Sequence, residues 1–130
     1  MKSNSSFIVI IMVFFFVHIT LLPCSRLKTK ANLLTCSNYK IKSQKFTATC
    51  DGKNLEIPLI NCIGNNNGEL VKGKNFYDSC FCSKKLNGKR GTRLVCFCGD
   101  NSFPKKQIRT SINLVKVITI ANGNLKCWKC

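Results

Sequence analysis

The chain has 130 residues, with 21 lysines and arginines against 5 aspartates and glutamates, and 10 cysteines. Its only histidine, His18, lies in an apolar segment near the N-terminus, which excludes Ser-His-Asp and Cys-His catalysis from the rest of the chain. The net charge of +16 favours anionic partners, and the cysteine content is typical of a disulfide-stapled protein of an oxidising compartment.

The first 25 residues are typical of a secretory signal peptide. Lys2 precedes an apolar block, Phe7–Leu22, and the small residues Cys24 and Ser25 suit a cleavage site. The block is shorter than the ~20 apolar residues that span a bilayer. We therefore expect cleavage and secretion, without stable membrane insertion. The remaining 105 residues, 26–130, are enough for a single domain. Because the removed segment contains Lys2, no acid and one cysteine, this domain has a charge of +15 and nine cysteines.

A sequence pattern occurs twice in this domain, 55 residues apart. Residues 57–70 and 112–125 share Ile, Leu, Ile, Asn, Gly and Leu at six of fourteen aligned positions. We therefore expect two repeats, at about 32–73 and 74–127.

Local patterns within the repeats favour an all-β fold. Lys45–Cys50 alternates polar and apolar residues, and Thr92–Phe97 does so more loosely. Asn-Gly pairs at 67–68, 87–88 and 122–123 are typical of tight hairpin turns. No sustained helical stripe is present, although the segments at 57–63 and 112–118 have room for a short 3₁₀ or helical turn.

Cysteine spacing predicts two bridges across one hairpin. Facing positions of an antiparallel hairpin have a constant index sum, and Cys80 with Cys98 gives the same sum, 178, as Cys82 with Cys96. This register favours the direct pairs over Cys80–Cys96 with Cys82–Cys98, which would join diagonal neighbours. A Cys36–Cys50 bridge would close the equivalent hairpin of the first repeat.

Three cysteines remain: Cys62, Cys127 and Cys130. Either Cys62 pairs with one of the other two, or residues 127–130 close a local loop. The terminal C-x-x-C lacks the βαβ context of a redox motif. With no histidine after the signal segment, we expect neither a zinc site nor a cofactor.

Residues 33–126 resemble the cyanovirin-N homology (CVNH) lectin family. The resemblance rests on an ordered set of motifs: Cys36 and Cys50 fourteen apart, the I-x-L, Ile63 and N-G-x-L series in both copies, and Phe76 four residues before Cys80. It implies a pseudo-symmetric fold of two intertwined units, each with a triple-stranded sheet and a β-hairpin. It also implies a lectin, not an enzyme, that binds oligosaccharides, typically mannose-rich ones, in shallow pockets.

The resemblance assigns two carbohydrate sites. The better site would use short polar side chains and exposed backbone at Gly64, Asn65, Asn67, Asn75, Asp78, Ser79, Gly99, Asp100 and Asn101. The second would use Thr35, Asp51, Lys53, Ala121 and Asn122, where Ile120 and Ala121 are poor sugar ligands. The chain departs from the family pattern in its second hairpin bridge, in Val71-Lys72 where an aromatic residue is usual, and in its higher charge.

The expected partners are oligosaccharides and glycoproteins, bound by a monomer or a domain-swapped dimer. The alternative function is a cationic defence or effector protein that binds anionic polysaccharide or membrane surfaces through lysines such as Lys84-Lys85 and Lys105-Lys106. The scarcity of aromatic residues disfavours nucleic acid.

One pair of carboxylates resembles a catalytic constellation. The hairpin register would place Asp78 opposite Asp100, near the ~5 Å separation of retaining glycosidases. Nothing apolar in the sequence adjoins the pair to raise the pKa of an acid. We therefore interpret the two carboxylates as acceptors for sugar hydroxyls or as solvated hairpin ends.

Overall fold

The computed structural model describes residues 33–128. The expected signal peptide and Cys130 lie outside the described residues. The described chain folds into ten strands and four single-turn 3₁₀ helices, without an α-helix. None of the helices in this range is long and apolar enough to cross a membrane.

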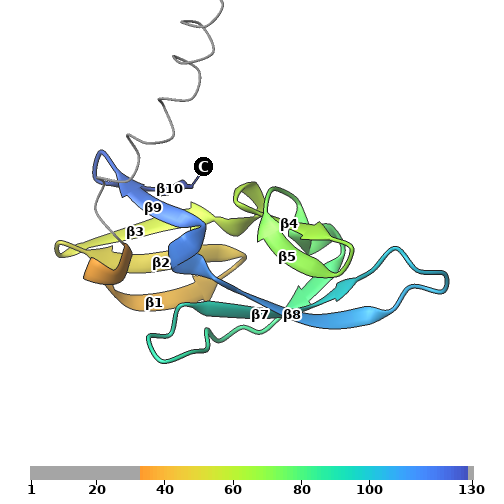
Figure 1. Ribbon diagram of the computed structural model, residues 1–130. Helices are drawn as coiled ribbons and strands as arrows, with labels where there is room; N and C mark the ends of the chain where they lie inside the picture. The colour runs from red at the N-terminus through yellow and green to blue at the C-terminus, as the bar shows by residue number, and fades with distance from the viewer. Residues whose placement is uncertain (1–32, 129–130) are drawn as a thin grey trace, which may run out of the picture. The chain divides into compact units, whose positions relative to one another are not determined.

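The first repeat begins with η2 (Leu33–Thr35) and an antiparallel sheet of β1 (Ser37–Lys42), β2 (Lys45–Cys50) and β3 (Lys53–Pro58). The alternation predicted for β2 is confirmed: Phe46, Ala48 and Cys50 are buried, while the residues between them face outward. One face of this sheet, whose three strands are labelled in Figure 1, is therefore core and the other is polar, as the burial pattern of β2 indicates.

A short hairpin completes each repeat. In the first, η3 (Leu59–Asn61) leads into β4 (Ile63–Asn66) and β5 (Glu69–Lys72); in the second, η5 (Leu114–Lys116) leads into β9 (Ile118–Ala121) and β10 (Asn124–Cys127). Both hairpins turn at an Asn-Gly pair with positive φ, 52° and 91° at Asn67-Gly68 and 53° and 75° at Asn122-Gly123. These two turns and both 3₁₀ helices agree with the sequence expectation.

The second sheet consists of β6 (Cys80–Cys82), β7 (Arg93–Gly99) and β8 (Gln107–Asn113), preceded by η4 (Phe76–Asp78). Its register places Cys80 opposite Cys98 and Cys82 opposite Cys96. The Asn87-Gly88 pair, in contrast, does not form a two-residue turn, because Asn87 pairs with Arg93 and a wider loop lies between them.

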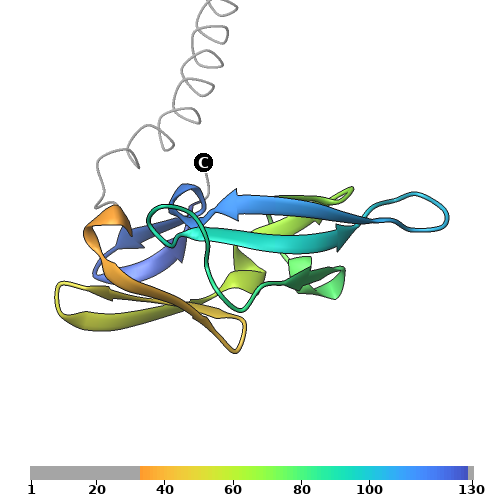
Figure 2. The same ribbon diagram turned by 90° about the horizontal axis from the view of Figure 1, so that it is seen from below.

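Each unit of the fold draws strands from both repeats. The β4–β5 hairpin lies on the second sheet, where the Leu70 backbone N–H donates to Thr110 Oγ1 at 3.1 Å. The β9–β10 hairpin returns to the first sheet and contacts β3 (Figure 2). The intertwined, all-β arrangement implied by the family resemblance is confirmed.

Four disulfides staple the fold: Cys36–Cys50, Cys62–Cys127, Cys80–Cys98 and Cys82–Cys96. Every cysteine within residues 33–128 is bonded, and such a framework is typical of an oxidising compartment. The positions shared by the two repeats form the core, since Leu59 and Leu114, like Ile63 and Ile118, are equivalent and fully buried. The sequence repeat therefore reflects the equivalent packing of these residues in the core.

Candidate functional site

Asn65 in β4 joins three segments of the chain. Its Nδ2 donates to Ser79 Oγ at 2.8 Å and to the Gly99 carbonyl at 2.9 Å, and its Oδ1 accepts from the Gly68 backbone N–H at 2.8 Å. Both amide protons are therefore engaged within the protein. Asn65 positions the surrounding groups and offers no free donor to a ligand.

A second contact joins the β4–β5 turn to the loop after β7. The Asn101 backbone N–H donates to Asn67 Oδ1 at 2.8 Å. Asp100 organises this loop, because its Oδ1 accepts from Ser102 N at 3.0 Å, from Lys106 N at 2.9 Å and from Ser102 Oγ. The Ser102 hydroxyl and the Lys106 N–H hold the pKa of the Asp100 carboxyl below its usual range.

The expected pairing of Asp78 with Asp100 is wrong. The β6–β7 ladder begins at Cys80 and Cys98, and Asp78 lies before it in η4. The Asp100 carboxylate is bound to its own loop, so the two carboxylates do not form a facing pair. The Gly99 N–H still donates to the Ser79 carbonyl at 2.9 Å, but Asp78 belongs to the 3₁₀ turn η4, which ends the hairpin register on which the expectation rested.

A cleft of about 220 Å³ opens at the end of the second sheet, beside Asp78, Ser79 and Gly99. Gly99 forms part of its lining, and a Cβ at this position would meet only ordinary contacts of 3.6–3.9 Å. The cleft is smaller than the ~300–1,000 Å³ of pockets that enclose drug-sized ligands, so it would hold only part of an oligosaccharide. Its complete lining is Tyr77, Asp78, Ser79, Cys80, Phe81, Gly99, Lys105 and Gln107.

Five lining residues were not predicted as carbohydrate-site residues from the sequence: Tyr77, Cys80, Phe81, Lys105 and Gln107. The side chain of Phe81 is 78% exposed, an unusual position for a large apolar residue. Its orientation could have been predicted, because the bridged Cys80 and Cys82 face inward and the residue between them must face outward. Tyr77 is half-buried, and burial raises the pKa of its phenol, which therefore stays protonated as a donor at neutral pH.

The remaining predicted residues of the better site shape the backbone nearby. A Cβ at Gly64 would lie 3.2 Å from Lys74 N, so the glycine permits close packing of β4 on the chain that follows β5. Asn75 adopts a left-handed conformation with φ of 67°, and its N–H donates to the Ile60 carbonyl at 2.8 Å. Neither residue lines the cleft.

The second expected site has fewer polar groups available. Three segments lie at the same end of the unit that contains the first sheet: the β2–β3 turn, η2 and the β9–β10 turn (Figures 1 and 2). The first contains Asp51, with Lys53 directly after the turn, the second contains Thr35, and the third contains Asn122. Ala121, however, is buried, and the equivalent of Asn65 is the partly buried Ile120. This end therefore has no counterpart of the Asn65 hydrogen bonds.

The sequence profile of the CVNH domain matches residues 33–126. Microvirin, in a mannobiose complex, is 27% identical, with a TM-score of 0.57 over 72% of this chain and 94% of that one. GzCVNH of Gibberella zeae is 21% identical, with a TM-score of 0.58 over 73% and 94%. A MoCVNH3 variant in complex with (N-GlcNAc)4 is 16% identical, with a TM-score of 0.61 over 76% and 97%. No curated protein matches the chain.

The match to the CVNH domain over residues 33–126 places the chain in a non-enzymatic class of carbohydrate-binding proteins. The chain belongs to the CVNH domain family of lectins.

Proposed function

We propose that this protein is a secreted lectin that binds neutral oligosaccharides, mannose-rich ones among them, in the cleft beside Gly99. The observation that carries the proposal is the cleft itself, in which a glycine, an exposed aromatic ring and several polar groups converge. The N-terminal segment and the four disulfides support secretion.

The lining of the cleft suits a sugar chemically. The Asp78 carboxylate can accept hydrogen bonds from vicinal hydroxyls, and a bond to a charged group contributes about 1.5–3 kcal/mol. The Ser79 hydroxyl and the Gln107 side-chain amide can each donate and accept hydrogen bonds. The Phe81 ring supplies an apolar surface for the C–H face of a sugar ring.

Two related structures support the ligand class. Microvirin is solved with mannobiose and the MoCVNH3 variant with (N-GlcNAc)4, both uncharged sugars at neutral pH. The end of the molecule near Ala121 would contribute little, since its equivalent of Asn65 is Ile120.

A glycan array at low and high salt tests the proposal, with Gly99→Ala as the diagnostic variant. Binding of neutral glycans should survive high salt, because it does not depend on long-range charge. Gly99→Ala should fold normally, since its Cβ meets no contact shorter than 3.6 Å. The methyl group would narrow the cleft and lower neutral-glycan affinity by roughly tenfold, equivalent to ~1.4 kcal/mol.

An unaltered affinity in the folded Gly99→Ala protein would remove the cleft as the sugar site. Loss of all glycan binding at high salt would favour the charge-driven alternative over the lectin proposal.

A further inference from the structure

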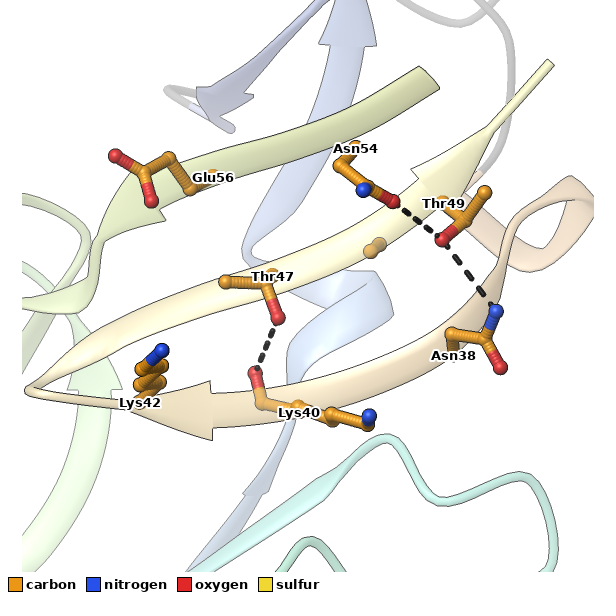
Figure 3. A pocket seen from close by; sticks show the side chains of 8 residues that line it. Asn38, Lys40, Lys42, Thr47, Thr49, Asn54 and Glu56 are labelled. Atoms are coloured by element: carbon orange, nitrogen blue, oxygen red, sulfur yellow. Dashed lines mark hydrogen bonds between the residues drawn. The ribbon is translucent and has the colours of Figure 1, made fainter. Parts of the chain in front are cut away.

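A polar groove of about 440 Å³ runs over the outer face of the first sheet (Figure 3). Because side chains alternate along a strand, this face gathers every second residue of each strand. Strand β1 supplies Asn38, Lys40 and Lys42, β2 supplies Thr47 and Thr49, and β3 supplies Asn54 and Glu56.

A row of hydrogen bonds crosses the groove from β1 to β3. Asn38 Nδ2 donates to Thr49 Oγ1 at 3.5 Å, and Thr49 Oγ1 donates to Asn54 Oδ1 at 2.9 Å (Figure 3). The other atoms of the two amides, Asn38 Oδ1 and Asn54 Nδ2, make no hydrogen bond within residues 33–128. They present an acceptor and a donor to whatever lies in the groove.

The charges at this groove are mostly positive. Glu56 is its one acidic lining residue, and Lys45 Nζ lies 3.3 Å from its Oε1. Lys40 and Lys42 have no ion-pair partner among the described residues. The Glu56 charge is thus offset by Lys45, and the charges of Lys40 and Lys42 are left for a ligand.

Lys40 also lines a second cleft, of about 400 Å³, between β1 and the loop at 83–92. This cleft contains Lys84 and Lys85 and no acidic residue, with Tyr39, Ile41, Leu86 and Gly91 completing its lining. Lys40 therefore lines both hollows, while Lys42 lines the first and Lys84 and Lys85 line the second. We call Lys40, Lys42, Lys84 and Lys85 together the basic track.

We propose that the basic track, with the Asn38–Thr49–Asn54 row, binds an acidic polysaccharide that carries carboxylate or sulfate groups. The lysines would contact the anionic groups, and the amide and hydroxyl row would contact the sugar hydroxyls between them. This site shares no lining residue with the neutral-sugar cleft beside Gly99, and so it goes beyond the proposed function.

Charge and hydroxyl chemistry favour a polysaccharide over nucleic acid. Single-stranded nucleic acid binds to exposed aromatic rings on which its bases stack. One aromatic residue, Tyr39, lines the two hollows. Its ring stacks on that of the buried Phe46, with the ring centroids 6.1 Å apart. Its hydroxyl donates to the Leu33 carbonyl at 2.8 Å, so the ring is held against the protein.

The test measures binding to polygalacturonate and dextran sulfate at about 50 mM salt and compares the loss of affinity per removed lysine charge between track and control variants. The quadruple variant Lys40→Gln, Lys42→Gln, Lys84→Gln, Lys85→Gln should lose at least roughly tenfold in affinity, as expected for several exposed ionic contacts acting together. The control variant Lys116→Gln with Lys126→Gln removes two exposed lysines that line neither hollow, and it should lose less than about twofold in affinity.

A second variant separates a built site from charge alone. Thr49→Val preserves the charge, the shape and the strand preference of the residue but removes the hydroxyl that links the two amides. It should weaken polysaccharide binding roughly threefold to tenfold, as loss of one or two hydrogen bonds predicts. Circular dichroism and non-reducing electrophoresis check that each variant is folded.

Several results would overturn the inference. Equal losses per lysine in the track and control variants, or no effect of Thr49→Val, would mean that net charge alone drives binding. No affinity for either polysaccharide would also overturn the inference, whereas a preference for one of them identifies carboxylate or sulfate as the ligand group. Tighter, track-dependent binding of single-stranded RNA would assign the surface to nucleic acid instead. Gly99→Ala should leave polysaccharide binding intact, so the two sites can fail separately.

Discussion

Asn65 and Ile120 occupy equivalent positions in the two repeats and give the two hairpins different surroundings. The Asn65 amide ties the β4–β5 hairpin to Ser79 and to Gly99, 34 residues away along the chain. Ile120 packs partly buried against the core and cannot make such bonds. A single residue difference thus creates a hydrogen-bonded site at one hairpin and a plain packing contact at the other.

Asp100 gives the loop at 100–106 a defined pH dependence. Its pKa is lowered, chiefly by the Ser102 hydroxyl and next by the Lys106 N–H. A carboxyl with a depressed folded pKa stabilises the folded loop above its unfolded pKa of ~3.9, and that contribution disappears as pH falls through the folded value. The order of the loop and binding in the adjacent cleft should therefore be constant from about pH 7 to 5 and decline below about pH 4.

An NMR titration of the Asp100 carboxyl, followed together with the Lys106 amide, measures this dependence. Asp100→Asn serves as the control, because its Oδ1 can still accept from Ser102 and Lys106 but does not titrate as a carboxyl. A Lys106 amide that responds to acid equally in both proteins would show that another group controls the loop.

At the scale of elements, the strand β6 determines which side chains reach the cleft. Its two cysteines are bridged to β7, which directs Phe81 outward to the cleft. Phe97, opposite Phe81 in the register, is 49% exposed on the same face but does not line the cleft. The two rings therefore form a matched pair for a binding experiment.

Phe81→Ala should lower the affinity for neutral oligosaccharide roughly threefold to tenfold, in keeping with the ~0.5–1.5 kcal/mol of an aromatic contact. Stability should change little, because the ring is 78% exposed. Phe97→Ala should bind as the parent does. Titration calorimetry of both variants decides the matter, and equal losses would point to a general effect of the sheet face.

Local patterns predicted the elements well where the controlling contacts are near in sequence. The alternation in Lys45–Cys50, the turn at Asn67-Gly68 and the cysteine register all depend on neighbouring residues or on a single hairpin. The Asn87-Gly88 turn was wrong because the chain there closes only at Arg93. The interactions of Asn65 and Asp100 were not predicted, since each depends on the folded path of a loop.

At the scale of the whole molecule, one disulfide differs from the other three. Cys62–Cys127 spans 65 residues and joins the two repeats, whereas the others close single hairpins. Cys82–Cys96 spans 14 residues and lies directly beside Cys80–Cys98 in the same ladder. The entropy of the unfolded chain should make these two bridges unequal in their effect on stability.

In the chain-entropy account, closing a 65-residue loop contributes about 4 kcal/mol and closing a 14-residue loop about 3 kcal/mol. The contribution of Cys82–Cys96 to stability is reduced further while Cys80–Cys98 is intact, because the Cys80–Cys98 bridge already restrains the same loop. Replacing Cys62 and Cys127 by alanine should therefore lower the free energy of unfolding by clearly more than replacing Cys82 and Cys96. Each pair removes one buried and one partly buried sulfur, so the packing losses are matched.

Urea unfolding of the two double variants under non-reducing conditions measures the difference, with the slope checked for changes in the unfolded state. Both variants should retain the paired strands, because each hairpin keeps its own ladder of backbone bonds. If the two variants lost equal stability, the link between the repeats would contribute no more than a local staple. The intertwining would then depend on the packing of the β9–β10 hairpin against β3 and of β5 against β8.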